Sequence, residues 1–150
     1  MQLGDAGQKL IKHYEQLRLA PYHGAADRAD LWSIGWGATR YLDGGKIFPS
    51  TPPISEPQAQ ALFLRDTLTP LQYVEACIQP ELTQNQIDAL VALIYNIGES
   101  NFEHSTLRRN INRGEADRIK AQWLKWDHAN GREVRGLLTR RKSEYVLFIS

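Results

Sequence analysis

The chain has 150 residues and a mass of 17.1 kDa, the size of one ordinary domain, and 42% of its residues are hydrophobic, which is enough for a core. Its 18 Lys and Arg against 17 Asp and Glu leave a net charge of +1, which excludes a strong overall attraction to nucleic acid. Residues 101–150 carry eleven basic and six acidic side chains. This basic C-terminal third would suit an anionic polymer, or it forms an ordinary solvated helical surface.

Targeting signals are missing from the parts of the sequence where they would be expected. The start, Met1 to Asp5, lacks the basic patch and apolar run of a signal peptide. The apolar run Ala89–Ile94 is far shorter than the roughly 20 residues of a membrane span. The lone Cys77 excludes an intramolecular disulfide and is predicted to be a buried structural thiol. We therefore expect a protein made in the cytoplasm without stable membrane association.

The first 53 residues predict a helix followed by a small, irregular β region. Residues 5–16 are predicted to form a short amphipathic helix, because apolar residues recur in it at helical spacing. Residues 20–53 are rich in glycine and proline, which favour turns. Within them, residues 31–37 alternate as a strand does, with Trp32, Ile34 and Trp36 on one face. Asp43-Gly44-Gly45 is typical of a hairpin turn.

From Ser55 onward the pattern is helical. Capping boxes at Ser55 and Thr83 predict two helix starts, Pro70 is expected to interrupt or kink the first helix, and Gly98 is expected to end the second. Further helices are predicted over residues 105–112, 115–128 and 137–148, with a turn at 130–131.

These elements predict a single α+β domain over residues 1–150. A β lobe of about residues 20–53 and a helical body of about residues 55–150, to which the first helix belongs, would enclose a cleft between two lobes.

Several acidic residues border the expected cleft. Glu15 ends the first helix just before the β region, and Asp27 and Asp30 lie on the loop into the strand that carries Ser33. Hydrolysis of a glycosidic bond needs two carboxylates, one to protonate the leaving oxygen and one to activate water or stabilise the charged centre. A chain with 17 acidic residues contains such pairs by chance, so this pattern alone is a weak indication.

The residues around Glu15 make the indication specific. The segment Glu15-Gln16-Leu17-Arg18-Leu19-Ala20-Pro21-Tyr22, with Asp27 and Ser33-Ile34-Gly35-Trp36-Gly37 after it, resembles the active-site segment of the phage-type lysozymes. These are the endolysins of glycoside hydrolase family 24, whose pattern is E-G-x-R-L-x-x-Y, then D, then T-x-G-x-G-H. Residues 82–90, Tyr95-Asn96-Ile97-Gly98, Ser105-Thr106-Leu107, Gly136-Leu137 and Arg140-Arg141 match later landmarks of the family in the same order.

The resemblance implies a role for each matching residue. Glu15 would be the general acid, Asp27 would position and polarise the attacking water, and Ser33 would replace the threonine that orients this water. Three extra residues between Glu15 and Asp27 leave Asp30 as an alternative for the second carboxylate. Gln16 replaces the usual glycine after the acid, and Ala38 replaces a histidine.

The resemblance also implies substrate contacts at Thr39, Tyr95, Asn96 and Thr106. Arg18 is expected to brace the acid and the turn rather than to clamp substrate. The four histidines have no metal-ligand spacing, and no nucleotide-binding glycine motif is present, so we expect neither a metal nor a cofactor.

The implied function is that of an endolysin, a monomeric muramidase acting on peptidoglycan glycan strands and inverting the anomeric carbon. Such an enzyme would accumulate in the host cytoplasm and reach the periplasmic wall after a holin opens the inner membrane; a virion-associated lysozyme is an alternative. A lytic transglycosylase and a catalytically silent peptidoglycan-binding module are two further hypotheses. A helical nucleic-acid binder is the weakest hypothesis, because it explains neither Glu15 nor the β region.

Overall fold

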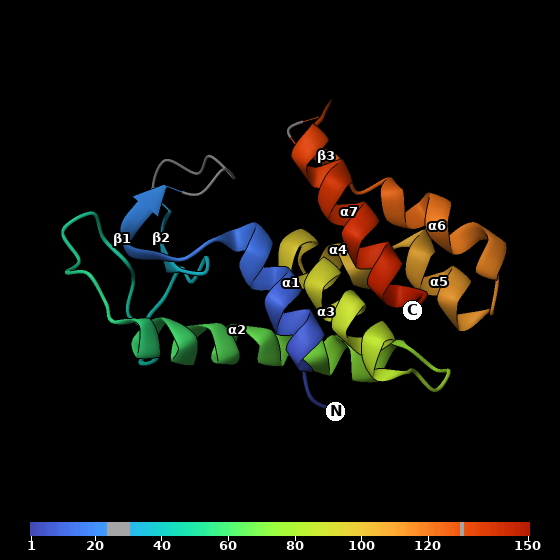
Figure 1. The fold of residues 1–150 in the computed structure, drawn as a ribbon, viewed down its shortest axis with the longest axis horizontal. Helices are drawn as coiled ribbons and strands as arrows, with labels where there is room; N and C mark the ends of the chain where they lie inside the picture. Colours follow the sequence, from blue (N-terminus) through green and yellow to red (C-terminus); the bar gives the residue numbers. More distant parts are fainter. Residues whose placement is uncertain (24–30, 130) are drawn as a thin grey trace. The chain divides into compact units, whose positions relative to one another are not determined.

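The computed structural model spans residues 1–150 and describes residues 1–23, 31–129 and 131–150 (Figure 1). The chain forms two compact units. The helical unit consists of Met1–Ile11 and Thr69–Ser150, and the strand unit of Lys12–Leu68. Two helices, α1 (Asp5–Glu15) and α2 (Glu56–Cys77), contribute residues to both units. The prediction of one catalytic domain over the whole chain stays a prediction.

The first turn of α1 is anchored on a buried carboxylate. The backbone N–H groups of Gly4 and Gly7 donate to the Asp88 carboxylate over 2.8 and 2.9 Å, and the Asp88 side chain is almost fully buried. A Cβ atom at Gly7 would lie 2.8 Å from Cβ of Asp88, so only glycine permits this close approach. The predicted helix over residues 5–16 is confirmed to within one residue.

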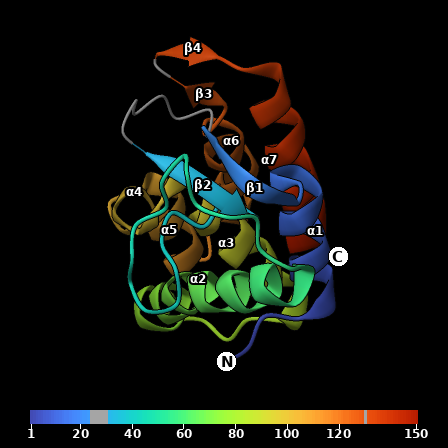
Figure 2. The ribbon, with the colours of Figure 1, turned by 90° about the vertical axis from the view of Figure 1, so that its left-hand side faces the viewer.

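The strand unit contains a two-stranded antiparallel sheet of β1 (Arg18–His23) and β2 (Trp32–Gly35), which lie side by side in Figure 2. β2 falls inside the predicted strand, but residues 33–36 are buried without alternation. The adjacent residues 35 and 36 both pack on α2. Trp36 packs against the Phe63 ring, with 5.7 Å between ring centroids, and a Cβ atom on Gly35 would lie 3.4 Å from Cβ of Ala59.

The predicted hairpin at residues 43–45 forms a turn but scarcely a ladder. Tyr41 N–H donates to the Gly45 carbonyl over 2.9 Å, and a single bridge joins Arg40 to Lys46. Arg65 of α2 donates to the carbonyl groups of Tyr41 and Arg40. The loop is therefore held by the side chain of a helix instead of by strand pairing.

Helix α2 begins at the predicted capping box and runs through Pro70. Ser55 N–H donates to Oε1 of Gln58 over 2.8 Å, and Gln58 N–H donates to Oγ of Ser55 over 3.3 Å. The interruption expected at Pro70 is absent, because Glu56–Cys77 is one helix. Thr67, Pro70 and Val74 are all buried at helical spacing, and this burial offsets the lost backbone hydrogen bond.

The helical unit is built around α3 (Gln84–Ile97), which packs on α7 (Arg135–Phe148) (Figure 1). The Thr83 capping box and the helix end at Gly98, where φ is 85°, are confirmed. Between α3 and α7 lie α4 (Glu99–Glu103), α5 (Thr106–Asn112), α6 (Ala116–Leu124), β3 (His128–Ala129) and β4 (Arg132–Glu133). Helix α6 ends before the predicted residue 128, and the sequence pattern does not predict the short α4, β3 and β4.

A cluster of charged side chains lies in the core of the helical unit. Arg140, Arg141 and Glu144 of α7 are at most 5% exposed. The Glu144 carboxylate accepts from Nη2 of Arg141 over 2.8 Å and from Nε of Arg140 over 3.1 Å, and Nε1 of Trp123 donates to it over 3.1 Å. Burial raises the pKa of Glu144, and the two guanidinium groups oppose that shift. Glu144 thereby ties α6 to α7 through the core.

The fold class predicted from the sequence is confirmed, because the chain combines helices with small antiparallel sheets. Cys77 is half-buried rather than buried, and its carbonyl accepts from Nδ2 of Asn112 over 2.8 Å. Across the described residues, no helix has both the length and the apolar character needed to cross a membrane.

Candidate active site

Glu15 is the last residue of α1, at the point where the chain turns toward β1. The turn is made by Gln16, whose φ of 55° lies in the left-handed region. This conformation costs a residue with a side chain about 1–2 kcal/mol, whereas glycine adopts it freely. Gln16 therefore makes this turn at a cost in stability that a glycine would avoid.

The carboxylate of Glu15 lies against the backbone of Gly37. A Cβ atom at Gly37 would be 3.5 Å from Oε2 of Glu15 and 4.0 Å from the Tyr22 hydroxyl oxygen, and the φ of Gly37 is 96°. The structure therefore gathers the end of α1, strand β1 and the segment after β2 around one carboxylate. Because Gly37 has no side chain, residue 37 adds no side-chain atom beside that carboxylate.

Tyr22 links the acid to the sheet. Burial raises the pKa of the Tyr22 phenol, the Glu15 carboxylate raises it further, and the Arg18 guanidinium opposes the shift. The guanidinium carbon of Arg18 lies 5.1 Å from the centroid of the Tyr22 ring. Arg18 therefore stacks on Tyr22, a contact that agrees with a bracing role.

Ser33 shares a face of the sheet with Tyr22. The two residues are directly paired across β1 and β2, so their side chains leave the same side of the sheet. Ser33 is only 7% exposed. Asp27 and Asp30, the two candidates for the second carboxylate, lie outside the described residues. The roles of Asp27 and Ser33 in positioning water stay predictions.

Thr39 also belongs to the strand unit, where it is half-buried. It follows Ala38, which is paired with Ile34 through two backbone hydrogen bonds of 2.9 Å. Ala38 is 2% exposed. The side chain of Ala38 therefore belongs to the packed interior of the strand unit.

The other three predicted substrate contacts lie in the helical unit. Tyr95 and Asn96 occupy the last turn of α3, where Tyr95 is half-buried and Asn96 exposed. Oδ1 of Asn96 accepts from Nη2 of Arg141 over 2.9 Å. Thr106 is the exposed first residue of α5, and its hydroxyl oxygen accepts from Nη2 of Arg109 over 2.7 Å. Each remains a predicted contact.

Three further residues lie next to predicted site residues, and the sequence does not indicate these contacts. Tyr22 and Gly37 stand in the motif, but only the structure brings them to the Glu15 carboxylate. The spacing of Tyr22 and Gly37 in the sequence does not predict this contact, because the contact depends on how β1 pairs with β2. Arg141 matches a landmark of the family, and nothing in the sequence indicates its bond to Asn96.

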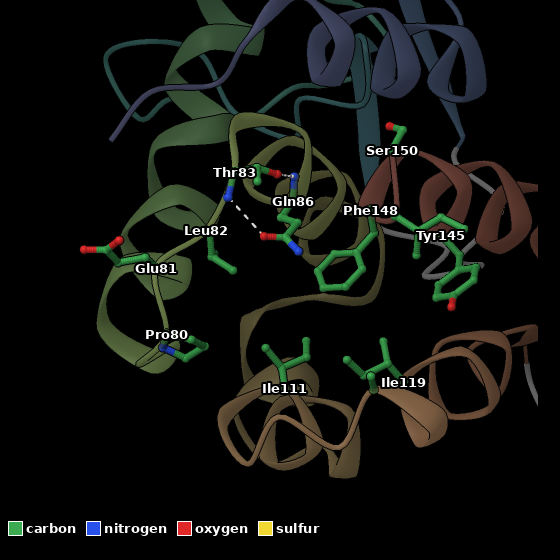
Figure 3. A pocket seen from close by; sticks show the side chains of 12 residues that line it. Pro80, Glu81, Leu82, Thr83, Gln86, Ile111, Ile119, Tyr145, Phe148 and Ser150 are labelled. Carbon is green, nitrogen blue, oxygen red and sulfur yellow. Dashed lines mark hydrogen bonds between the residues drawn. The ribbon is translucent and has the colours of Figure 1, made fainter.

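A pocket of about 490 Å³ in the helical unit contains none of the predicted site residues. Figure 3 shows Phe148 and Tyr145 on one side of it and Ile111 and Ile119 on another. The dashed lines in Figure 3 join Thr83 to Gln86, whose polar atoms form the capping box of α3. The lining is thus mainly apolar and offers no acid–base pair. In the described part of the chain, no three His, Cys, Asp or Glu side chains are grouped to hold a metal ion.

Comparisons with known proteins agree with the motif. A family model described as phage lysozyme matches residues 12–144. An endolysin of Acyrthosiphon pisum secondary endosymbiont phage 1 is 36% identical over 154 residues, covering 100% of this chain and 99% of that protein. The structure of an endolysin from Escherichia coli O157:H7 phage FAHEc1 gives a TM-score of 0.87 at 31% identity, over 100% of this chain and 94% of that one. The structure of the muramidase domain of SpmX from Asticaccaulis excentricus gives a TM-score of 0.84 at 29% identity, over 99% of this chain and 98% of that one.

The family model and the full-length relatives cover both units and include the motif around Glu15. The chain therefore belongs to the phage lysozyme family and is a lysozyme.

Proposed function

We propose that this lysozyme is a muramidase, which hydrolyses the β-1,4 bond between N-acetylmuramic acid and N-acetylglucosamine in peptidoglycan, with Glu15 as its general acid. The observation that carries the proposal is the Glu15 carboxylate against the Gly37 backbone and near the Tyr22 hydroxyl, in the motif that the family shares. The similarity to a named muramidase domain supports the substrate class.

The reaction breaks the bond between the anomeric carbon and the bridging oxygen. Glu15 gives its proton to that oxygen as it leaves, and the oxygen of a water molecule bonds to the anomeric carbon from the opposite face. The water proton passes to the second carboxylate, for which Asp27 is our candidate and Asp30 the alternative. Ser33 would accept or donate a hydrogen bond to hold the water.

The absence of a side chain at Gly37 supports this role of Glu15. A side chain at Gly37 would enter the space next to Oε2 of Glu15, where a bridging oxygen must come to receive a proton. Thr39, Tyr95, Asn96 and Thr106 are proposed to contact the glycan.

We further propose that the whole chain acts as one monomeric catalytic domain. It would be an endolysin that is held in the host cytoplasm and acts on the periplasmic wall after holin-mediated release.

Mass spectrometry of the fragments released from purified peptidoglycan tests the proposal. The parent protein should produce reducing-end muramic acid, and NMR recorded within the first turnovers should show the α anomer, since the β bond is inverted. Glu103→Gln, an exposed carboxylate on α4, is the matched control and should give the same fragments. Anhydromuramic ends would contradict the proposal in favour of a lytic transglycosylase. Release of no fragments would contradict it in favour of a binding module.

A further inference from the structure

Lys12 lies on α1 one turn before Glu15, and its ammonium group contacts side chains from two other segments of the strand unit. Nζ of Lys12 lies 4.5 Å from the centroid of the Trp36 ring and 5.0 Å from the centroid of the Phe63 ring. It also donates to Oε1 of Gln60. Because both rings are buried, the ammonium group meets them where water is largely excluded, and there a cation–π contact is strongest. Lys12 therefore ties the last turn of α1 to α2 and to the segment after β2.

Two residues on one face of α1 contact two consecutive residues after β2. The Lys12 ammonium group meets Trp36, and the Glu15 carboxylate lies against Gly37. Side chains three residues apart on a helix are neighbours, about 5–6 Å apart, and consecutive Cα atoms of a chain are about 3.8 Å apart, so the two contacts run side by side. One contact alone would let the end of α1 swing about it, whereas two adjacent contacts hold it in one direction along residues 36–37.

The backbone at Lys12 closes the turn around Glu15 independently of the Lys12 side chain. The N–H group of Gln16 donates to the Lys12 carbonyl over 3.0 Å. A substitution at Lys12 leaves this bond in place, since every residue has the carbonyl group. Such a substitution therefore removes the side-chain contacts to Trp36 and Gln60 without opening the turn that carries the acid.

We infer that Lys12 is a positioning residue, which holds the Glu15 carboxylate in the place beside Gly37 from which it protonates the leaving oxygen. This inference rests on the proposed function, in which Glu15 is the general acid. A general acid must lie within hydrogen-bond reach of the atom that it protonates, and a displacement of about 1 Å can lower a rate about 10²-fold. Lys12 acts through the placement of Glu15 and not by contact with the reacting atoms.

Steady-state kinetics on soluble peptidoglycan strands test the inference. Lys12→Met keeps an unbranched side chain against the two rings but loses the ammonium group. Its kcat should fall about 10-fold while KM stays nearly unchanged, because Nζ of Lys12 binds the protein's own side chains. Lys12→Arg keeps the charge, the stacking on aromatic rings and a donor for Gln60, so it should restore most of the parental kcat. Lys9→Met, at an exposed lysine one turn earlier on α1, is the matched control and should keep the parental kcat.

The comparison separates positioning from stability and from charge. Rates are recorded at a temperature at which circular dichroism shows every variant to be folded. A lysine that only stabilises the fold would lower the Tm of Lys12→Met and leave kcat unchanged at that temperature, a result that would overturn the inference. Equal falls in kcat for Lys12→Met and Lys9→Met would also overturn it, because they would assign the effect to the loss of a positive charge near an anionic glycan.

A measurement without turnover uses the contact between Glu15 and Gly37. The ¹H–¹⁵N NMR signal of Gly37 should shift on Glu15→Gln, and this shift should be smaller when Lys12→Met is already present. Equal shifts in the two backgrounds would overturn the inference. Fragment release by Glu15→Gln at the rate of the parent would instead overturn the proposed acid, while the Gly37 signal still reports on the placement of the carboxylate.

Should Lys12→Met fail to fold, Gln60→Met replaces it in both experiments. This change removes the acceptor and leaves the lysine and the two rings in place. It should lower kcat and reduce the Gly37 shift in the same directions by smaller amounts. A Gln60→Met protein that equals the parent in both quantities would overturn the inference.

Discussion

Two glutamates, one in each unit, differ in how deeply they are buried. Glu144 in the helical unit is fully buried and its carboxylate accepts from Arg140, Arg141 and Trp123. Glu15 in the strand unit is half-buried at the end of a helix, against the backbone of a glycine and near a tyrosine hydroxyl. We propose a structural role for the fully buried carboxylate in the core and the chemistry for the half-buried one at the end of a helix.

The difference teaches that burial and charge pairing alone are poor guides to a catalytic carboxylate. Glu144 has a raised pKa and a dense set of partners, features that often mark active sites. Arg140, Arg141 and Trp123 are nevertheless side chains of the same core, so a substrate would have to displace them. At Glu15, residue 37 adds no side chain beside Oε2.

The largest expected effect belongs to Glu15. Glu15→Gln removes the proton donor without changing shape, so kcat on peptidoglycan should fall about 10²- to 10⁴-fold. The Tm should stay within a few degrees of the parent, because Glu15 is not part of the core. Turbidity of wall suspensions and thermal unfolding measure the two quantities. Retention of most activity would remove Glu15 from its role.

Glu144→Gln should have the converse effect. It leaves two buried guanidinium groups without their carboxylate, so the free energy of unfolding should fall by about 3–5 kcal/mol. Urea unfolding followed by circular dichroism measures the change. An unchanged midpoint would mean that the cluster does not stabilise the helical unit.

Asp88 is a second buried carboxylate, whose partners are N–H donors instead of charged groups. Asp88→Asn should lower the free energy of unfolding by about 1.5–3 kcal/mol, because the N–H groups of Gly4 and Gly7 lose a charged acceptor. Asp5→Asn on the exposed side of α1 is the matched control and should change stability little. Equal effects of the two changes would show that the anchoring of α1 contributes nothing.

Gly37→Ala tests whether the absence of a side chain beside Glu15 matters. Gly37 and Gly44 both have positive φ values, 96° and 85°, so alanine should cost about 1–2 kcal/mol of stability at either position. Only the Cβ atom at Gly37 enters the space beside the Glu15 carboxylate, since a Cβ atom at Gly44 meets nothing within 4 Å. We expect kcat to fall for Gly37→Ala alone; a similar fall for Gly44→Ala would point to strain as the cause.

The smallest expected effect is a titration. The pKa of Tyr22 is raised above its ordinary value of 10.0, so the unfolded phenol loses its proton first as the pH rises. The contribution of Tyr22 to stability is therefore complete below pH 10 and is lost as the pH rises through the folded pKa. Absorbance at alkaline pH, compared with Tyr22→Phe, follows the phenol. Glu15→Gln should move its pKa back toward the ordinary value, and no movement would contradict their proximity.

The sequence predicted the helices better than the strands, for a local reason. Capping boxes at Ser55 and Thr83 and the glycine at Gly98 are short-range signals, and each is confirmed. Strand β1 contains Pro21 and pairs with β2, which begins at Trp32, so no short window of sequence reveals the pairing. The same holds for the site. The motif indicated Glu15, whereas the approach of Tyr22 and Gly37 depends on the fold.

The most direct measurement compares Glu15→Gln and Glu144→Gln on the same peptidoglycan, with fragment release at low temperature and thermal unfolding recorded for both. We predict a crossed result, in which Glu15→Gln releases no fragments and melts like the parent, while Glu144→Gln releases reducing-end fragments and melts at a lower temperature. Fragment release by Glu15→Gln at the rate of the parent would contradict the assignment of the chemistry to Glu15. A Glu144→Gln protein that releases no fragments but has the Tm of the parent would contradict the assignment of stability to Glu144.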